Sequence, residues 1–160
     1  GVDFDLQKVA NKVFETIAMA KVSTSGDEAM ENNFLNKRDG VSVNQDHQLY
    51  DAKQAVLALH QTGYRAPQRK KVPVVGETGY GTLLLGAQAM LHSGYISEHD
   101  LKIAKKLAHV IAGGKVPFGT EVDEQYLLDL EREAFLSLVA EPKSQQRMQH
   151  MLVKGKPLRN

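Results

Sequence analysis

The sequence has 160 residues, of which 42% are hydrophobic and 6% aromatic, enough to bury one aliphatic core. Its 20 Lys and Arg balance 19 Asp and Glu, so the formal charge of +1 gives no overall reason to expect nucleic acid or an anionic membrane as a partner. The absence of cysteine excludes disulfides, thiolate metal sites and a cysteine nucleophile, and no apolar run approaches the roughly 18 to 20 residues of a membrane span.

The first predicted elements are an amphipathic helix and a short helix. Between Asp3 and Ala20, with Asp3 and Asp5 at the start, apolar residues recur at helical spacing: Leu6, Val9, Ala10, Val13, Phe14 and Ile17. Ser25 is followed three residues later by Glu28, a pattern in which each side chain accepts from a free amide at a helix start. The short helix should end near Asn33, which tolerates the left-handed conformation.

A turn, a short extended piece and a long helix are predicted next. Asp39-Gly40 marks the turn, and residues 41–43 are the sole strand candidate. A helix capped by Asn44 or Asp46 should follow and stop at Gly63, with a buried stripe of Leu49, Ala52, Val56 and Leu59. Residues 62–81 contain two prolines and four glycines, so they are predicted to be a loop and the internal boundary of the chain.

The second half is predicted to be helical throughout. Thr82 to His92 should form a buried helix that ends at Gly94, and Ser97 with Asp100 should open another that ends at Gly113-Gly114. The predicted buried face of that second helix consists of Leu101, Ala104, Ala108 and Ile111. Residues 122–140 should form a further helix, whose predicted buried face consists of Tyr126, Leu127, Leu130, Ala134 and Leu138. Pro142 suits the first turn of a final helix. The fold class is therefore all-α, with six or seven helices.

Three motifs suggest ligands but have simpler interpretations. GETGYG, residues 76–81, matches neither the dinucleotide nor the P-loop spacing, so a plain turn is favoured over a phosphate loop. The basic run RAPQRKK, residues 65–71, is interpreted as a solvated loop, with a phosphate or an acidic partner as the alternative. None of the six histidines stands in a tight ligand spacing, so no metal site is predicted.

No catalytic residue is predicted from the residues alone. Ser97, His99 and Asp100 lie too close on one helix start to align as nucleophile, base and orienter, whereas a capping role explains Ser97. Glu131 and Glu133 point to different sides of their helix, which makes a cooperating acid/base pair improbable.

The closing stretch QRMQHMLVKGKPLRN places apolar residues along one side of a helix and follows them with a basic tail. The apolar residues are Met148, Met151 and Leu152, and the tail carries Lys154, Lys156 and Arg159. Such stripes normally complete a core, with the lysines solvating the chain end. The alternative is a clasp that closes over a ligand.

Residues 131–160 resemble the closing segment of the crotonase superfamily, the enoyl-CoA hydratases, in which an acidic-aromatic helix precedes a short helix and a Lys-rich tail. Residues 20–67 resemble the hydratase stretch with a small helix, a turn and a long Ala-rich helix, although Asn33 replaces the usual Gly. As a whole the chain resembles the C-terminal end of the bifunctional 3-hydroxyacyl-CoA dehydrogenase/enoyl-CoA hydratases of fatty-acid β-oxidation. The start at Gly1, without an initiator Met, is the one expected of a C-terminal fragment.

This resemblance implies one cytoplasmic helical domain over residues 1–160. Crotonase-like helices would span 1–67, a family-specific helical insertion 68–125, and the closing helices with the basic tail 126–160. The catalytic glutamates and the NAD fingerprint of the parent enzyme would precede Gly1. The chain should therefore hold no cofactor and be inactive alone, while the parent enzyme uses NAD and an acyl-CoA substrate.

The resemblance also implies a ligand site and partners. Met151 takes the place of an apolar residue that lies along CoA, and Lys154 and Lys156 take the places of basic residues that face its phosphates. The implied partners are the hydratase core of the parent enzyme, acyl-CoA and further copies in a homo-oligomer, but not nucleic acid or a membrane. The competing hypothesis is a free-standing helical interaction module whose basic loop binds an acidic partner protein.

Overall fold

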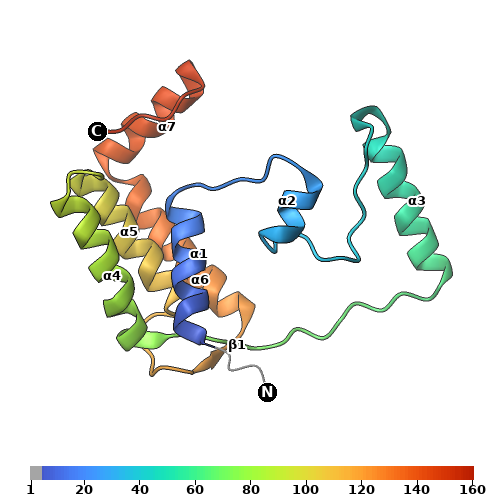
Figure 1. Cartoon of the computed structure of the whole chain (residues 1–160), viewed down its shortest axis with the longest axis horizontal. Helices are drawn as coiled ribbons and strands as arrows, with labels where there is room; N and C mark the ends of the chain where they lie inside the picture. Colours follow the sequence, from blue (N-terminus) through green and yellow to red (C-terminus); the bar gives the residue numbers. More distant parts are fainter. Residues whose placement is uncertain (1–4) are drawn as a thin grey trace. The chain divides into compact units, whose positions relative to one another are not determined.

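The computed structural model describes residues 5–160, and its seven α-helices there confirm the all-α prediction (Figure 1). The chain forms two compact units. The first unit combines the start of the chain, up to Ala20, with Arg69–Asn160, and the second unit is Lys21–Gln68. The division between Gln68 and Arg69 falls within the stretch 62–81 that is predicted to be a loop.

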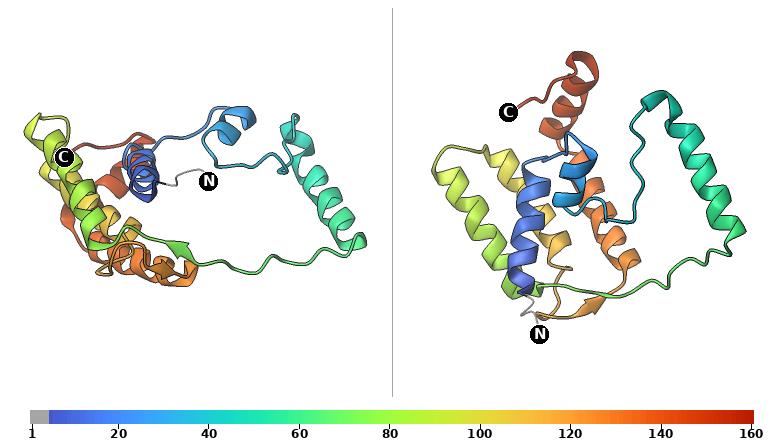
Figure 2. Two further views of the ribbon diagram at one scale, coloured as in Figure 1. Left: turned by 60° about the horizontal axis from the view of Figure 1, so that its bottom comes forward. Right: turned by 45° about the vertical axis from the view of Figure 1, so that its right-hand side comes forward.

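The first unit contains five helices and one small sheet: α1 (Leu6–Ala18), β1 (Val72–Pro73), α4 (Gly76–His92), α5 (Glu98–Ile111), β2 (Glu121–Val122), α6 (Glu124–Val139) and α7 (Pro142–Lys154). α1 packs on α4 and α5, α5 packs on α6, and α6 leads into α7 (Figures 1 and 2). Asp5 caps α1, because its carboxylate accepts from the amide of Lys8 at 3.0 Å. The other predicted start residue, Asp3, lies outside the described residues.

The core of this unit lies where the start of α4 meets the end of α5. Val75, Ala10 and Ala112 are buried together, with Leu6, Tyr80 and Ile111 packed against them. α6 joins this end because Tyr126 donates from its hydroxyl to the carbonyl of Gly113 at 3.0 Å. Of the residues predicted to face inward on α6, Ala134 is buried, Leu127, Leu130 and Leu138 are half-buried, and Tyr126 is 36% exposed.

The loop predicted over residues 62–81 is wrong for residues 76–81, which form the first turns of α4. Gly76 has a φ of +59°, and a Cβ there would lie 2.2 Å from the carbonyl oxygen of Val116. Its amide donates to Ala112 and the amide of Glu77 donates to Val116, at 2.9 and 3.0 Å. Glycine is therefore required for close backbone packing, and these two amides are already engaged, which argues against a phosphate site.

The strand predicted at residues 41–43 is wrong as well. No strand forms there, and Val43 is fully exposed. The strands of the described chain are instead β1 and β2, an antiparallel pair in which Val72 opposes Val122 and Pro73 opposes Glu121. Each strand has only two residues, too few to produce the alternating pattern by which a strand is recognised in a sequence.

The second unit contains α2 (Gly26–Glu31), a 3-10 turn at Gln45–His47 and α3 (Gln48–Gln61). Ser25 caps α2 as predicted, accepting from the amide of Glu28 at 3.1 Å. The carboxylate of Glu28, however, accepts from the amide and hydroxyl of Thr24, at 2.7 and 2.6 Å, rather than from Ser25. Asn33 adopts the predicted left-handed conformation, with a φ of +60°.

The predicted buried stripe of α3 is wrong. Leu49 is 83% exposed and Val56 is 64% exposed, and every residue of α3 is exposed. The helical period is as predicted, but the second unit contains no other long helix to cover the stripe. The apolar stripe of α3 is therefore left uncovered within its own unit.

Candidate functional site

The closing helix α7 has the start that its sequence predicts. Pro142 occupies the first turn, and Gly155 ends the helix in the left-handed conformation, with a φ of +63°. The apolar ridge on this helix does not complete the core of the chain, since Met151 is 46% exposed and Leu152 is 84% exposed. The ridge is therefore available to another surface or to a ligand.

After Gly155 the tail folds back along α7. A ring nitrogen of His150, Nδ1, lies 2.8 Å from the carbonyl oxygen of Lys156. A shallow groove of about 620 Å³ lies between the helix and the tail, lined by Pro142, Gln145, Gln146, Gln149, His150, Val153, Lys154 and Leu158. Of the three predicted CoA contacts, only Lys154 lines this groove. Met151 and Lys156 are exposed and do not line it.

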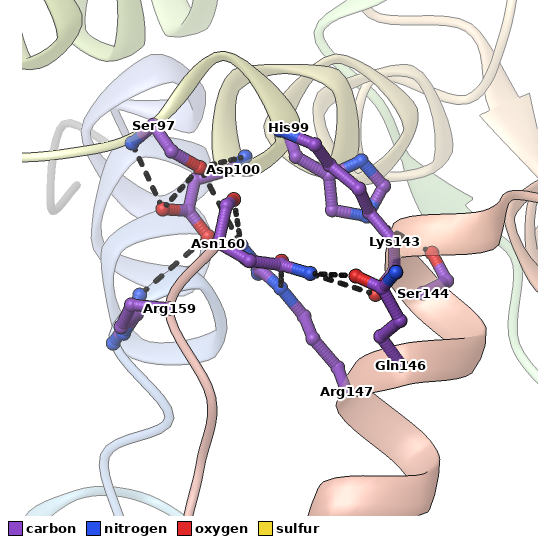
Figure 3. Close-up of polar contacts among 9 residues, drawn as sticks. All are labelled: Ser97, His99, Asp100, Lys143, Ser144, Gln146, Arg147, Arg159 and Asn160. Carbon is purple, nitrogen blue, oxygen red and sulfur yellow. Dashed lines mark hydrogen bonds and ion pairs between the residues drawn. The ribbon is translucent and has the colours of Figure 1, made fainter.

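A cluster of polar side chains fastens α7 and the tail to the start of α5, and we call it the anchor cluster: Ser97, Asp100, Arg147, Arg159 and Asn160 (Figure 3). Arg147 donates from Nη1 to Asp100 at 2.6 Å and from Nε to the side-chain oxygen of Asn160 at 2.8 Å. Its Nη2 donates to the main-chain oxygen of Asn160 at 3.2 Å. The guanidinium of Arg147 therefore joins α5, α7 and the tail.

Asp100 serves the helix start and the anchor cluster at once. Ser97 and Asp100 form the predicted capping box, in which Ser97 Oγ accepts from the amide of Asp100 and Asp100 accepts from the amide of Ser97. Burial alone would raise the pKa of Asp100, but the Ser97 amide, Arg147 and the Ser97 hydroxyl together outweigh it and lower that pKa. The carboxylate is therefore held in its ionised form.

Two further contacts join α5 to α7. The buried ring of His99 places Nε2 at 3.0 Å from the hydroxyl of Ser144, and its pKa is lowered by burial and then by the positive charges of Arg147 and Lys143. Lys102 donates to Glu141 at 2.5 Å, and this bond lowers the pKa of Glu141. Three residues of α5, together with its cap Ser97, thus hold the start of α7 in place.

The anchor cluster is suited to positioning rather than to acid/base catalysis. His99 faces Ser144, while Asp100 faces Ser97 and Arg147, so these groups do not line up as nucleophile, base and orienter. The capping role predicted for Ser97 is confirmed. Within residues 5–160 no group of three His, Asp or Glu side chains is placed to hold a metal ion. In the same part of the chain no helix is long and apolar enough to cross a membrane.

Sequence reasoning missed the anchor cluster, although it identified Ser97 and Asp100 as a helix cap. Ser144 and Arg147 are three residues apart and therefore lie on one face of α7, a signal visible in the sequence. Their partners lie 45 and 47 residues earlier in the chain. No local pattern connects helices across that separation.

The fold and the anchor cluster define an all-α chain whose closing helix is fastened to α5 near its start, through Ser144 and Arg147, and leaves the apolar ridge exposed toward its end. No protein-family model matches the chain, and no solved structure matches it. The chain is 70% identical, over 156 residues, to a Bacillus subtilis (strain 168) protein described as a probable 3-hydroxyacyl-CoA dehydrogenase. The match covers 98% of this chain but 20% of that protein, so the chain spans about a fifth of the length of this relative.

Proposed function

We propose that this chain is the C-terminal helical assembly and acyl-CoA-covering part of a cytoplasmic β-oxidation enzyme, and that it is not catalytic alone. The observation that carries the proposal is the 70% identity over nearly the whole chain to a much longer probable 3-hydroxyacyl-CoA dehydrogenase. The parent enzyme would oxidise 3-hydroxyacyl-CoA with NAD and hydrate enoyl-CoA. Its catalytic residues would belong to other parts of that longer protein.

The assembly role is supported by apolar surface on several helices. Residues of α3, α6 and α7 leave large apolar side chains exposed, among them Leu49, Val56, Phe135, Leu136, Leu152 and Val153. Apolar patches of this kind mark interaction sites in soluble proteins. In the proposal they pack against the hydratase core or against further copies of the chain in a homo-oligomer.

The covering role is supported by the closing helix. Met151 and Lys154 are three residues apart on one helix face, and Lys156 follows just beyond the turn at Gly155. An exposed thioether beside two exposed ammonium groups suits a ligand that has both an apolar part and phosphates, as acyl-CoA does. The anchor cluster holds α7 at Arg147, one turn before Met151 on the same helix face, and so fixes the orientation in which this face is presented.

The test is the double substitution Lys154→Glu/Lys156→Glu in the parent enzyme. KM for acyl-CoA should rise several-fold at low salt with kcat largely retained, because each exposed charge contact is worth up to about 1 kcal/mol and binds ground and transition states alike. The effect should shrink as salt screens the charges. Met151→Ala should raise KM independently of salt, since it removes apolar contact. An unchanged KM at low salt in the double variant would show that the tail is a solvated end.

A further inference from the structure

The three-helix group α1, α4 and α5 is tightly packed at one end and open at the other. At the packed end Val75 and Ala112 are buried against Leu6, Tyr80 and Ile111. At the other end a cavity of about 770 Å³ lies between the three helices and the tail. Its apolar lining includes Phe14, Ala18, Ala87, Met90, Ile103 and Leu107.

The cavity exists because small residues occupy positions where the helices meet. Ala87 and Ala104 are buried, while the larger Phe14, Met90 and Leu107 around them are only half-buried and keep apolar surface exposed. A second cavity of about 430 Å³ shares Phe14, Ala87 and Met90 with the first and continues between α1 and α4. Both volumes fall in the range of small-molecule sites, about 300 to 1,000 Å³.

The anchor cluster forms the polar rim of the larger cavity, since all five of its residues line it. The guanidinium of Arg147 is engaged by Asp100, Ser97 and Asn160. Arg159 is less tightly engaged than Arg147, because it is 69% exposed and lies 3.6 Å from the carboxylate oxygen of Asp100. Arg147 and Arg159 thus both approach the Asp100 carboxylate, and the exposed Arg159 can offer its donors to an added anion.

We propose that this cavity binds the hydrocarbon chain of a single-chain amphiphile whose anionic end meets Arg159. An apolar space with one cationic group at its rim is complementary to an acyl chain with a negatively charged terminus, either the carboxylate of a fatty acid or the phosphates of an acyl-CoA. The site lies apart from Met151, Lys154 and Lys156 and does not depend on the function proposed for them.

The test is displacement of cis-parinaric acid, an intrinsically fluorescent fatty acid, from the 160-residue chain. Dodecanoate and dodecanol should both displace the probe, and dodecanoate should do so at several-fold lower concentration. If dodecanoyl-CoA displaces the probe at lower concentration than dodecanoate, the CoA phosphates are the anionic end. If dodecanoate displaces it at lower concentration, the free carboxylate is the anionic end. Failure of the probe to bind, or displacement by CoA alone as effective as by dodecanoyl-CoA, would overturn the proposal.

Substitutions locate the site. Ala18 is exposed and lines both cavities, so Ala18→Trp should fill the space and lower the affinity for every ligand by about tenfold or more. Gly86 lines the smaller cavity, and an added Cβ there meets nothing within 4 Å, so Gly86→Leu should fold and should also weaken binding. Retained affinity in both variants would overturn the proposal.

The role of Arg159 has a matched control. Arg159→Gln should weaken dodecanoate several-fold and leave dodecanol unchanged, because only the carboxylate loses a charged partner. Arg132 on α6 is equally exposed, at 66%, and pairs with Asp129 away from the cavity, so Arg132→Gln should change neither. Equal effects of Arg159→Gln on dodecanoate and dodecanol would contradict the assignment of Arg159 to the anionic end. The double variant Lys154→Glu/Lys156→Glu should bind dodecanoate normally, which separates this site from the proposed acyl-CoA cover.

Discussion

Arg147 on α7 and Asp100 at the start of α5 form an ion pair of 2.6 Å in which both side chains are largely buried, at 17% and 13% exposure. The two residues are 47 positions apart in the sequence. Because burial reduces solvent screening, this pair differs in kind from the surface pairs of the chain. It fixes the closing helix on the three-helix group.

The first prediction concerns this pair. Arg147→Ala should lower the free energy of unfolding by about 3 kcal/mol, because it leaves the carboxylate of Asp100 in a partly buried place without its main cation. Urea unfolding followed by circular dichroism measures the change. Arg132→Ala is the control, since it breaks an exposed pair with Asp129 and should cost under about 1 kcal/mol. Equal costs for the two variants would show that burial of the Arg147 pair contributes nothing.

The second prediction concerns pH. The lowered pKa of His99 means that the unfolded chain binds a proton more readily than the folded chain. The contribution of His99 to the free energy of unfolding is therefore fully present above its ordinary pKa of about 6.5. It is lost as the pH falls through that value toward the lowered pKa. The charged groups around His99 have opposite effects on its pKa: Arg147 and Lys143 lower it, while Glu141 and Asp100 raise it.

The measurement is the free energy of unfolding between about pH 7 and pH 5. The original chain should lose stability on acidification across this window. In His99→Gln, which can still bond to Ser144, the loss should be smaller because the titrating group is gone. Asp100 also has a lowered pKa, but it contributes only at lower pH, below the ordinary range of a carboxyl group. The same slope in both proteins would show that His99 is not responsible.

The third prediction concerns two glycines of one helix. Gly76→Ala should lower the free energy of unfolding by at least about 2 kcal/mol, since alanine is disfavoured at positive φ and its Cβ would meet the Val116 carbonyl. Gly81 lies in α4, and a Cβ added there would meet nothing within 4 Å. Gly81→Ala should therefore stabilise the chain by up to about 1 kcal/mol, through helix propensity alone. Thermal unfolding of the two variants should move in opposite directions.

Helix ends and periods were predictable because local residues determine them. Ser97 with Asp100, Pro142 and Gly155 each act within one turn of their own position. Burial was less predictable, since the apolar stripe of α3 reveals its period but not whether a partner covers it. The packing glycine at Gly76 depends on the carbonyl of Val116, forty residues later, so its role could not be inferred from its neighbours.

The candidate site was predictable to a similar degree. The sequence identified the apolar ridge and the basic tail because both are continuous in the chain. It did not reveal that the tail folds back after Gly155, so that Asn160 and Arg159 reach the start of α5. That arrangement depends on Arg147, whose partners come from α5 and from the end of the chain.

The last prediction separates an assembly domain from a free-standing module by means of α3. Leu49→Gln should change the free energy of unfolding of the 160-residue chain by less than about 0.5 kcal/mol, because the side chain is 83% exposed there. In the parent enzyme the same substitution should cost more, since the proposal places the apolar face of α3 against another surface, where an unpaired amide is costly. Thermal unfolding of both proteins measures the difference. Lys53→Gln, on the same helix and also exposed, should have little effect in either protein. An equally small effect of Leu49→Gln in the parent enzyme would favour the free-standing module, because α3 would then be uncovered in both proteins.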